Sequence, residues 1–235
     1  DAEGKKPSTK GAGGKFTHHR GIFLGWSKRR FNGKSYDRWH MKGGDIVHQE
    51  FLKQQTKGDS AVFTSKTHWM DEAGKPLLDE ERTMAVQSPA EGPVRMVIDF
   101  QSKMTAAYGE VSLNGDPEHA GIQYRPANEV DVKKTKYFFP KEEVNLKKDL
   151  DLPWIAETYV LDGKSYSVVQ MNHPDNPKGT RHSAYRDYGR FGSFFVKDIP
   201  KGESLTVNYR YWIIDGAMPE REVITKAREA WAKGE

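Results

Sequence analysis

The chain has 235 residues, with 37 Lys and Arg against 33 Asp and Glu and a net charge of +4. This length suits one large domain with a hydrophobic core, and 11% aromatic residues argue against a disordered chain. The absence of cysteine excludes disulfides, thiolate nucleophiles and Cys-ligated metal sites, and the near balance of charges argues against a nucleic-acid-binding surface.

The sequence suggests no membrane span, and its first residues do not allow targeting to be read. No apolar run approaches the roughly 20 residues of a membrane-spanning helix, so no membrane association is expected. The chain begins with DAEGKKPSTKGAGG, without Met or an apolar signal segment, which indicates a processed or trimmed chain. The basic run SKRRFNGK (27–34) surrounds an Asn-Gly pair and is interpreted as a hairpin tip.

Alternation of apolar and polar residues with a period of two dominates the chain and predicts strands. The first strand is expected to open within THHRGIFLGW (17–26), with His18, His19 and Arg20 at its start. The later strands are rich in β-branched or aromatic residues and are bounded by turn-forming residues. They are expected at 45–55, 60–70, 78–87, 94–104, 120–125, 154–161, 165–172, 192–199 and 203–214.

Turn and helix signals complete the pattern. The pairs Asn32-Gly33 and Asp162-Gly163 are typical of two-residue hairpin turns, and residues 71–76 and 199–204 suit longer hairpin loops. Only the last segment has helical character, because Pro219 lies near its start and its apolar residues can form one stripe. A helix is therefore expected at 218–232, whereas 126–153 is expected to be a long irregular loop.

These elements predict an all-β fold class, a large antiparallel β-sandwich with a short C-terminal helix. The mutarotase-like supersandwich is one candidate form of it. We see no internal repeat or linker, so residues 1–235 are expected to form a single β-sandwich domain, trimmed at its N-terminus. GAGGKF (11–16) is not a phosphate-binding loop, because Thr9 and Phe16 stand where that motif needs Gly and Ser or Thr.

Four stretches concentrate imidazole, charged and aromatic side chains. HPDNPKGTRHSAYRDYGRFG (173–192) holds three arginines, two histidines and two tyrosines, which a plain connector does not need. Its prolines and glycines are explained by tight turns alone, so the interest lies in its YRDYGRFG half. The other three stretches are THHRGIFLGW (17–26), GGDIVHQEF (43–51) and GDPEHAGIQYRPANE (115–129).

The last of these stretches predicts a polar strand face. A period of two places His119, Gln123 and Arg125 on one face and Ile122 and Tyr124 on the other, where they can enter the core. A row of His, Gln and Arg is unusual on a sheet unless that face lines a wet cleft. The motif therefore predicts a ligand-binding cleft at this strand.

The motifs HHRGIFLGW, HAGIQYRPANEV and MNHPDNPKGTRHSAYRDYGRFGSFF resemble a bacterial domain of unknown function that is named methane oxygenase PmoA-like, over nearly the whole chain. The resemblance implies an exported protein, periplasmic or secreted, of a kind often found among carbohydrate-degradation genes. It does not carry the methane oxygenase activity over, because a subunit of the particulate methane enzyme should span the membrane.

A sugar-binding site needs aromatic faces for the apolar side of the ring and polar groups for the hydroxyls. Arginines would also pair bidentately with an acidic sugar. The alternative is that these charged residues form internal salt bridges that hold a loop. The residues expected to bind substrate are His19, Arg20, Trp26, Gln123, Arg125, Tyr185, Arg186 and Arg190, with Trp39 and Tyr188 nearby.

Three histidines are candidates for general acid or base catalysis: His48, His119 and His173, with Glu50 or Asp187 as the carboxylate partner. His48 and Glu50 are two residues apart and are expected on one strand face. The leading hypothesis is an enzyme that acts on a carbohydrate ligand as a lyase, hydrolase or epimerase. An ordinary hydrogen-bonding role is expected for the histidines His40, His68 and His182.

Two alternatives remain open. A non-catalytic glycan-binding module would show exposed coplanar rings on a shallow face, and no His–carboxylate pair within hydrogen-bond distance. A His-ligated metalloenzyme would bind Cu, Zn or Fe, but the sequence requires no cofactor, and neighbouring His18 and His19 are expected on opposite strand faces. No metal ligand is assigned, neither nucleic acid nor membrane is expected as a partner, and the oligomeric state is left open.

Overall fold

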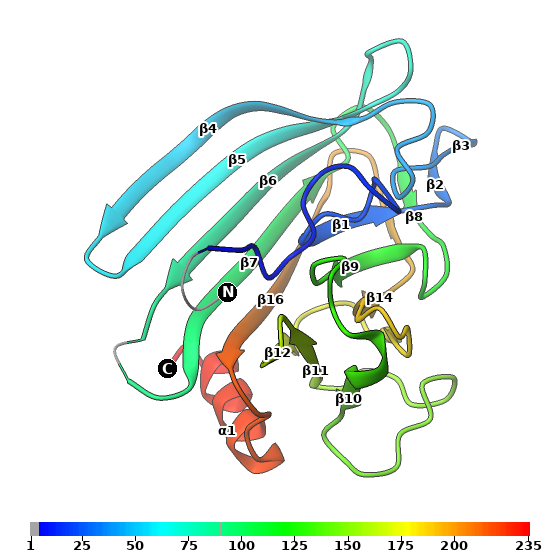
Figure 1. The fold of residues 1–235 in the computed structure, drawn as a ribbon. Coiled ribbons are helices and arrows are strands. Elements are labelled where there is room, and N and C mark those ends of the chain that lie inside the picture. Colours follow the sequence, from blue (N-terminus) through cyan, green and yellow to red (C-terminus); the bar gives the residue numbers. More distant parts are fainter. Residues whose placement is uncertain (1–4, 90) are drawn as a thin grey trace.

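The structure is a computed structural model that describes residues 5–89 and 91–235, so the first four residues of the expected domain lie outside the described part. Its centre is an eight-stranded antiparallel sheet with the order β10-β11-β12-β16-β7-β6-β5-β4 (Figure 1). The bounds are β4 Ile46–Lys57, β5 Ser60–Met70, β6 Pro76–Gln87, β7 Val94–Thr105, β10 Lys136–Phe138, β11 Trp154–Leu161, β12 Lys164–Asn172 and β16 Ser204–Asp215.

Two four-stranded sheets cover part of this large sheet. One has the order β1-β9-β14-β13, and the other has the order β15-β8-β2-β3. Their bounds are β1 Ile22–Trp26, β9 Ala120–Tyr124, β14 Phe191–Phe194, β13 Arg181–Ala184, β15 Lys197–Ile199, β8 Val111–Leu113, β2 Arg29–Phe31 and β3 Lys34–Tyr36. Buried residues of the small sheets, such as Leu24 and Ile122, share one hydrophobic cluster with Phe100 and Tyr211 of the large sheet. This packing makes the fold a sandwich.

The opposite face of the large sheet carries the C-terminal helix α1, Arg221–Ala232. On β12, Val168 belongs to the main core and Val169 to a second cluster that includes Ile224 of the helix. Side chains alternate between the two faces of a strand, so the two clusters lie on opposite sides of the sheet. In the described part of the chain, no helix combines the length and the apolar character that crossing a bilayer requires.

The outer strands of the large sheet extend beyond the small sheets, as Figure 1 shows for β4, β5 and β6. On β4, Ile46 is half-buried and every residue after it is exposed. On β5, by contrast, Ser65, Thr67 and Trp69 are buried in alternation near the end that meets β2 and β3. The uncovered strands and the edge of the β1-β9-β14-β13 sheet leave a hollow between them, in which part of the candidate site lies.

The predicted all-β sandwich with a short C-terminal helix is confirmed. The long strands appear within two residues of the expected bounds, except that the strand expected at 192–199 is divided into β14 and β15. The short strands β8, β10 and β13 were not predicted, whereas β2 and β3 pair on either side of Asn32-Gly33, as the expected hairpin tip requires. Both Asx-Gly pairs have positive φ at each residue, 46° and 79° for Asn32-Gly33 and 51° and 77° for Asp162-Gly163, as hairpin turns of this type require. The irregular 126–153 stretch contains a short 3-10 helix, Val132–Lys134.

Candidate functional site

Four histidine rings from three separate segments lie together at the edge of the β1-β9-β14-β13 sheet. The ring centroids are 4.3 Å apart for His18 and His19, 4.8 Å for His18 and His40, and 5.4 Å for His40 and His119. We call these four residues the histidine cluster. His18 and His19 precede β1, His40 follows β3, and His119 precedes β9. The cluster therefore depends on the arrangement of the strands, which brings these three loops to one place.

Two of the four histidines are held by the same local structure. In the turn 37–40, Asp37 Oδ1 accepts hydrogen bonds from the backbone N–H of Trp39 and His40, and Asp37 Oδ2 lies 2.8 Å from His40 Nδ1. In the turn 116–119, Asp116 Oδ1 accepts from the N–H of His119 and lies 3.0 Å from its Nδ1. An Asp side chain readily accepts backbone N–H bonds within such a turn, so the local sequence alone favours this contact between Asp and His in both turns.

The two aspartate carboxylates determine the tautomer and the orientation of the imidazole rings of His40 and His119. An Asp oxygen beside Nδ1 makes that nitrogen the N–H donor and leaves Nε2 available to a ligand. The side chains of His40 and His119 are 31% and 44% exposed, so solutes can reach them. Two oriented His–Asp pairs at one accessible place can give and take protons.

The other two histidines are more enclosed. His19 is 4% exposed, and burial together with the neighbouring His18 and Arg190 lowers its pKa to about 2. Burial, with a further contribution from His40, lowers the pKa of His18 to about 4. Both rings are therefore neutral at physiological pH, since desolvation disfavours their charged form.

A buried layer of polar and aromatic side chains supports the cluster. Trp39 is 2% exposed, and its ring centroid lies 5.9 Å from that of His19 and 6.3 Å from that of His119. The Arg190 guanidinium lies 5.7 Å from the centre of the Trp39 ring. Arg190 donates hydrogen bonds to the backbone oxygen of Glu118 and, at 3.4 Å, to Gln123 Oε1. These contacts hold Trp39 and Arg190 in place beneath the histidine rings.

Glu118 joins the turn of His119 to the YRDYGRFG segment. Its carboxylate accepts a hydrogen bond of 2.5 Å from the Tyr185 hydroxyl and another from Arg186, and Arg190 Nη2 lies 3.8 Å away. Burial alone would raise the pKa of Glu118, but the bonds from Tyr185 and Arg186 and the charge of Arg186 outweigh it and lower the pKa. Glu118 is therefore a charged group that ties two loops together.

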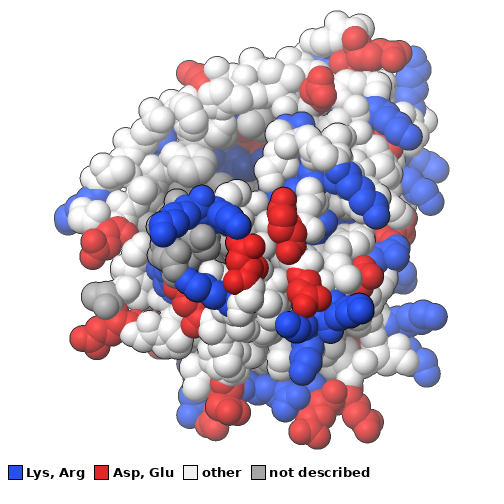
Figure 2. All heavy atoms as spheres, viewed as in Figure 1, with Lys and Arg blue, Asp and Glu red and all other residues white. Residues whose placement is uncertain are grey.

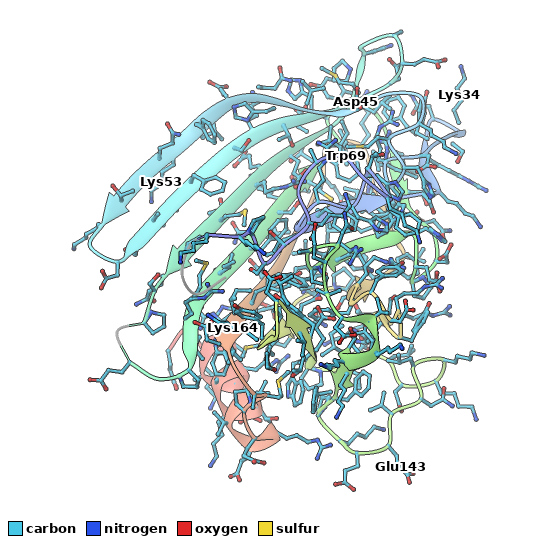
Figure 3. The ribbon with its side chains drawn as sticks, viewed as in Figure 1. Lys34, Asp45, Lys53, Trp69, Glu143 and Lys164 are labelled. Carbon is cyan, nitrogen blue, oxygen red and sulfur yellow. The ribbon has the colours of Figure 1, made fainter. Side chains whose placement is uncertain are left out.

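A groove of about 670 Å³ adjoins the cluster between β1 and the outer strands of the large sheet. Figure 2 shows the surface hollowed in this region, and Figure 3 labels Asp45 beside it, just before β4. The polar side chains that line the groove are His18, Arg20, Asp45, His48 and Arg82. His18 belongs to both the cluster and the groove, so the two form one continuous surface.

The structure brings many of the predicted site residues together. His19, His119, Gln123, Arg125, Tyr185, Arg186 and Arg190 lie in or directly around the cluster, and Arg20 and His48 line the adjoining groove. Three predicted residues lie elsewhere. Trp26 is fully buried in the core and unavailable to a ligand. His173 packs against Trp231 of α1, on the helix side of the large sheet. Asp187 is exposed, and none of the described histidines bonds to it.

Several local expectations at the site are wrong. His18 and His19 lie in an irregular turn rather than a strand, because no strand pairs with that segment, and their rings touch instead of pointing apart. His119 also precedes its strand. The partner of His48 Nδ1 is Ser65 Oγ at 2.6 Å rather than Glu50, because the strand pairing shifts between His48 and Glu50.

The predicted wet strand face is wrong too. Gln123 is 0% exposed and Arg125 is 3% exposed, so both are buried. Arg125 donates to the backbone oxygen of Tyr188, and, at 3.0 Å, to Asn128 Oδ1. Ile122 and Tyr124 do enter the core, as expected. The polar side chains of this strand thus support the site from below instead of lining it.

Sequence reasoning missed His40 and the two aspartates that hold the histidines. His40 was expected to have an ordinary hydrogen-bonding role, yet it lies at the centre of the cluster. The available signal was the repeated pattern DRWH (37–40) and DPEH (116–119), in which an Asp and a His are three residues apart. Within residues 5–89 and 91–235, no three His, Asp or Glu side chains are arranged to hold a metal ion.

Comparisons with known proteins place the chain in a family and give a relative of its fold. The model of a family of unknown function, DUF6807, matches residues 1–229. No curated protein sequence matches the chain. A solved structure from the human microbiome, assigned as a kojibiose phosphorylase, is similar with a TM-score of 0.50 and 7% identity over 88% of this chain. The chain spans 25% of the length of that protein, and at this identity the similarity concerns the fold alone.

Proposed function

The chain belongs to the DUF6807 family, a family of unknown function, and from its site geometry we propose that it is a carbohydrate-active enzyme that uses the histidine cluster for proton transfer. The observation that carries the proposal is the pair of His–Asp contacts, at 2.8 Å for His40 and 3.0 Å for His119, within one accessible cluster. A lyase, a hydrolase or an epimerase each needs a group that removes a proton and a group that delivers one.

The two His–Asp pairs can supply these two groups, one as the base and the other as the acid. Each ring is oriented through Nδ1, so each Nε2 can act as a base when neutral or as an acid when protonated. The ring centroids of His40 and His119 are 5.4 Å apart, a separation that one substrate molecule can bridge. Neutral His18 lies beside His40 and adds a hydrogen-bonding group without adding positive charge.

Carbohydrate is the substrate class that the surroundings favour. Phe16 is 37% exposed with its ring centroid 5.2 Å from that of His19, and Tyr185 is 50% exposed beside Glu118. Such rings can pack against the apolar side of a sugar, while His, Arg and Asp groups bind its hydroxyls. The sequence resemblance to proteins found among carbohydrate-degradation genes supports the same class, and the name of the fold relative gives a reason to include disaccharides in the first screen.

The test is a screen of glycans for binding and for product formation with the wild-type protein and the variants His40→Ala and His119→Ala. Loss of a general acid or base lowers the rate about 100-fold or more, whereas binding changes much less. The matched control is His68→Ala, because His68 forms another His–Asp contact, 3.3 Å from Asp79 on the large sheet, and lines neither the cluster nor the groove. This control should keep the full rate.

The possible results separate the candidate functions. A rate that survives both cluster substitutions would remove the histidines from the mechanism. Binding without any product, unaffected by the two substitutions, would instead identify a glycan-binding module. A protein that neither binds nor converts any glycan in the screen would refute the proposal as a whole.

A further inference from the structure

A second pocket, of about 770 Å³, lies on the far side of the turn that carries His119. One wall is the loop after β10, in which Glu143 is labelled in Figure 3, and another is β13. The residues that line it are Pro117, Val144, Asn145, Leu146, Lys147, Arg181, His182 and Tyr185. We call it the loop pocket. None of these residues except Tyr185 was expected to bind a ligand.

The loop pocket combines an apolar wall with an exposed aromatic ring. Val144 and Leu146 are half-buried and pack against the main hydrophobic cluster, so the loop is held in place. Tyr185 is 50% exposed, and its hydroxyl is fixed by the bond to Glu118. A pocket with this lining can hold a ring that has an apolar side, as the sugar ring has.

The charged groups of the pocket are all positive. Lys147 and Arg181 are exposed, and within the described part of the chain no carboxylate forms an ion pair with either. His182 also lines the pocket, but burial lowers its pKa to about 4, so it is neutral at physiological pH. The lining contains no Asp or Glu. Two cations without a counter-charge beside an apolar wall favour an anionic ligand.

Two carboxylates near the pocket, Asp149 and Asp151, have partners outside it. Asp149 lies 3.0 Å from Lys141 Nζ and accepts a backbone N–H bond from Asn145. Asp151 accepts from the backbone N–H groups of Gly179 and Thr180. Lys141 balances the charge of Asp149, whereas Asp151 keeps its charge because backbone N–H groups do not neutralise it. Neither carboxylate lines the pocket, so the charged side chains nearest a ligand in it are Lys147 and Arg181.

The loop pocket and the histidine cluster share one short turn. Pro117 lines the pocket, and His119 belongs to the cluster. Two residues of chain span at most about 7 Å, so the two sites are close enough for one oligosaccharide to reach both. Glu118 lies between them, and its bonds to Tyr185 and Arg186 fix the boundary.

We infer that the loop pocket binds the anionic group of an acidic glycan, a uronate carboxylate or a sulfate ester, while a neighbouring sugar unit lies at the histidine cluster. The inference rests on the proposed carbohydrate-active function and adds the charge of its substrate. Arg181 can pair with an oxyanion through two parallel N–H bonds, and Lys147 supplies a point charge.

The experiment measures binding by calorimetry with three oligosaccharides of equal length: an oligogalacturonate, a sulfated galactan fragment and a neutral cello-oligosaccharide. One of the charged probes should bind at least about tenfold more tightly than the neutral probe, and Arg181→Gln and Lys147→Gln should each lower its affinity about tenfold. Added salt should weaken the same preference. The matched control is Lys148→Gln, since Lys148 is an exposed lysine of the same loop outside the pocket lining.

The outcomes distinguish this inference from the function on which it rests. Equal binding of neutral and charged probes, with turnover that still depends on His119, overturns the acidic substrate and leaves the carbohydrate function standing. A preference for a charged probe that both pocket variants retain overturns the loop pocket as its site. Absence of binding to all three probes overturns the inference, and absence across the wider glycan screen overturns the proposed function too. The two charged probes decide between carboxylate and sulfate.

Discussion

Protonation of the buried histidine on β13 is expected to destabilise the fold in acid. His182 is 1% exposed, its Nε2 accepts a hydrogen bond of 3.1 Å from the backbone N–H of Leu152, and its Nδ1 lies 3.1 Å from Ser193 Oγ. A neutral ring satisfies both contacts, with Nδ1–H as the donor. A protonated ring has no acceptor nitrogen, so it would break the bond to Leu152 and would leave a charge in the core.

The size of the effect follows from the two pKa values. Burial lowers the pKa of His182 from 6.5 to about 4 in the folded chain. The unfolded chain therefore binds the proton first, and stability is complete above pH 6.5 and is lost as the pH falls from 6.5 to about 4. The full loss is about 3 kcal/mol, of which about 2 kcal/mol has occurred at about pH 5.

The assay is urea unfolding, followed by tryptophan fluorescence, at about pH 7.5 and about pH 5. His182→Gln should lower the free energy of unfolding at the higher pH by about 1–3 kcal/mol, because the bond to Leu152 is weakened. From about pH 7.5 to about pH 5, however, the free energy of unfolding of the variant should fall by about 2 kcal/mol less than that of the wild type. His18 and His19 are present in both proteins, so their contributions cancel in this comparison. Ile155→Val, a buried substitution that does not titrate, controls for destabilisation alone. An equal loss in the wild type and His182→Gln would refute the reasoning.

Two further predictions concern buried groups that hold the sandwich together. Glu80 is 0% exposed and accepts hydrogen bonds from four side chains. These bonds and the charge of Arg82 lower the pKa of Glu80 despite its burial. Glu157 is equally buried, but burial raises its pKa well above the ordinary value. Glu80→Gln should therefore lower the free energy of unfolding in urea by about 3 kcal/mol, whereas Glu157→Gln should change it by less than about 1 kcal/mol. Equal losses would contradict the opposite charge states of the two carboxyl groups. Gly121→Ala should lower the melting temperature far more than Gly163→Ala, because both glycines have positive φ but only at Gly121 would the new Cβ meet the backbone of β14. Similar melting temperatures would show that φ alone decides.

The candidate site could be predicted only in part, and the reason is visible in particular residues. The stretch 115–129 was singled out because His119, Gln123 and Arg125 share a period of two, and all three do belong to the site or its support. Their exposure was predicted wrongly for Gln123 and Arg125, because a strand pattern does not show whether another layer covers its polar face. The 117–120 turn and Arg190 cover Gln123 here, and the Tyr188 ring covers Arg125.

The histidines illustrate the same limit. His48, His119 and His173 looked alike in sequence, each within a stretch of polar and aromatic residues. In the fold, His119 lies in the cluster, His48 lines the adjoining groove, and His173 lies beneath the helix. His40 was expected to have only an ordinary hydrogen-bonding role, because a single histidine carries no sign of the partners that the fold brings to it. The Asp-x-x-His pattern that it shares with His119 identifies it only once the two turns are seen side by side.

The sequence by itself determined the features that depend on neighbouring residues. The alternation of side chains specifies the long strands, and the Asx-Gly pairs specify two hairpin turns. In the turns 37–40 and 116–119, the aspartate three residues before the histidine orients its ring. Only the tertiary structure decided which loops meet. The pairing of β9 with both β1 and β14 joins segments about 100 and 70 residues apart, and it brings the turns of His18 and His119 and the segment of Arg190 to one edge. Contacts of that range depend on how whole sheets pack, because the gain is the burial of a shared core rather than any local bond.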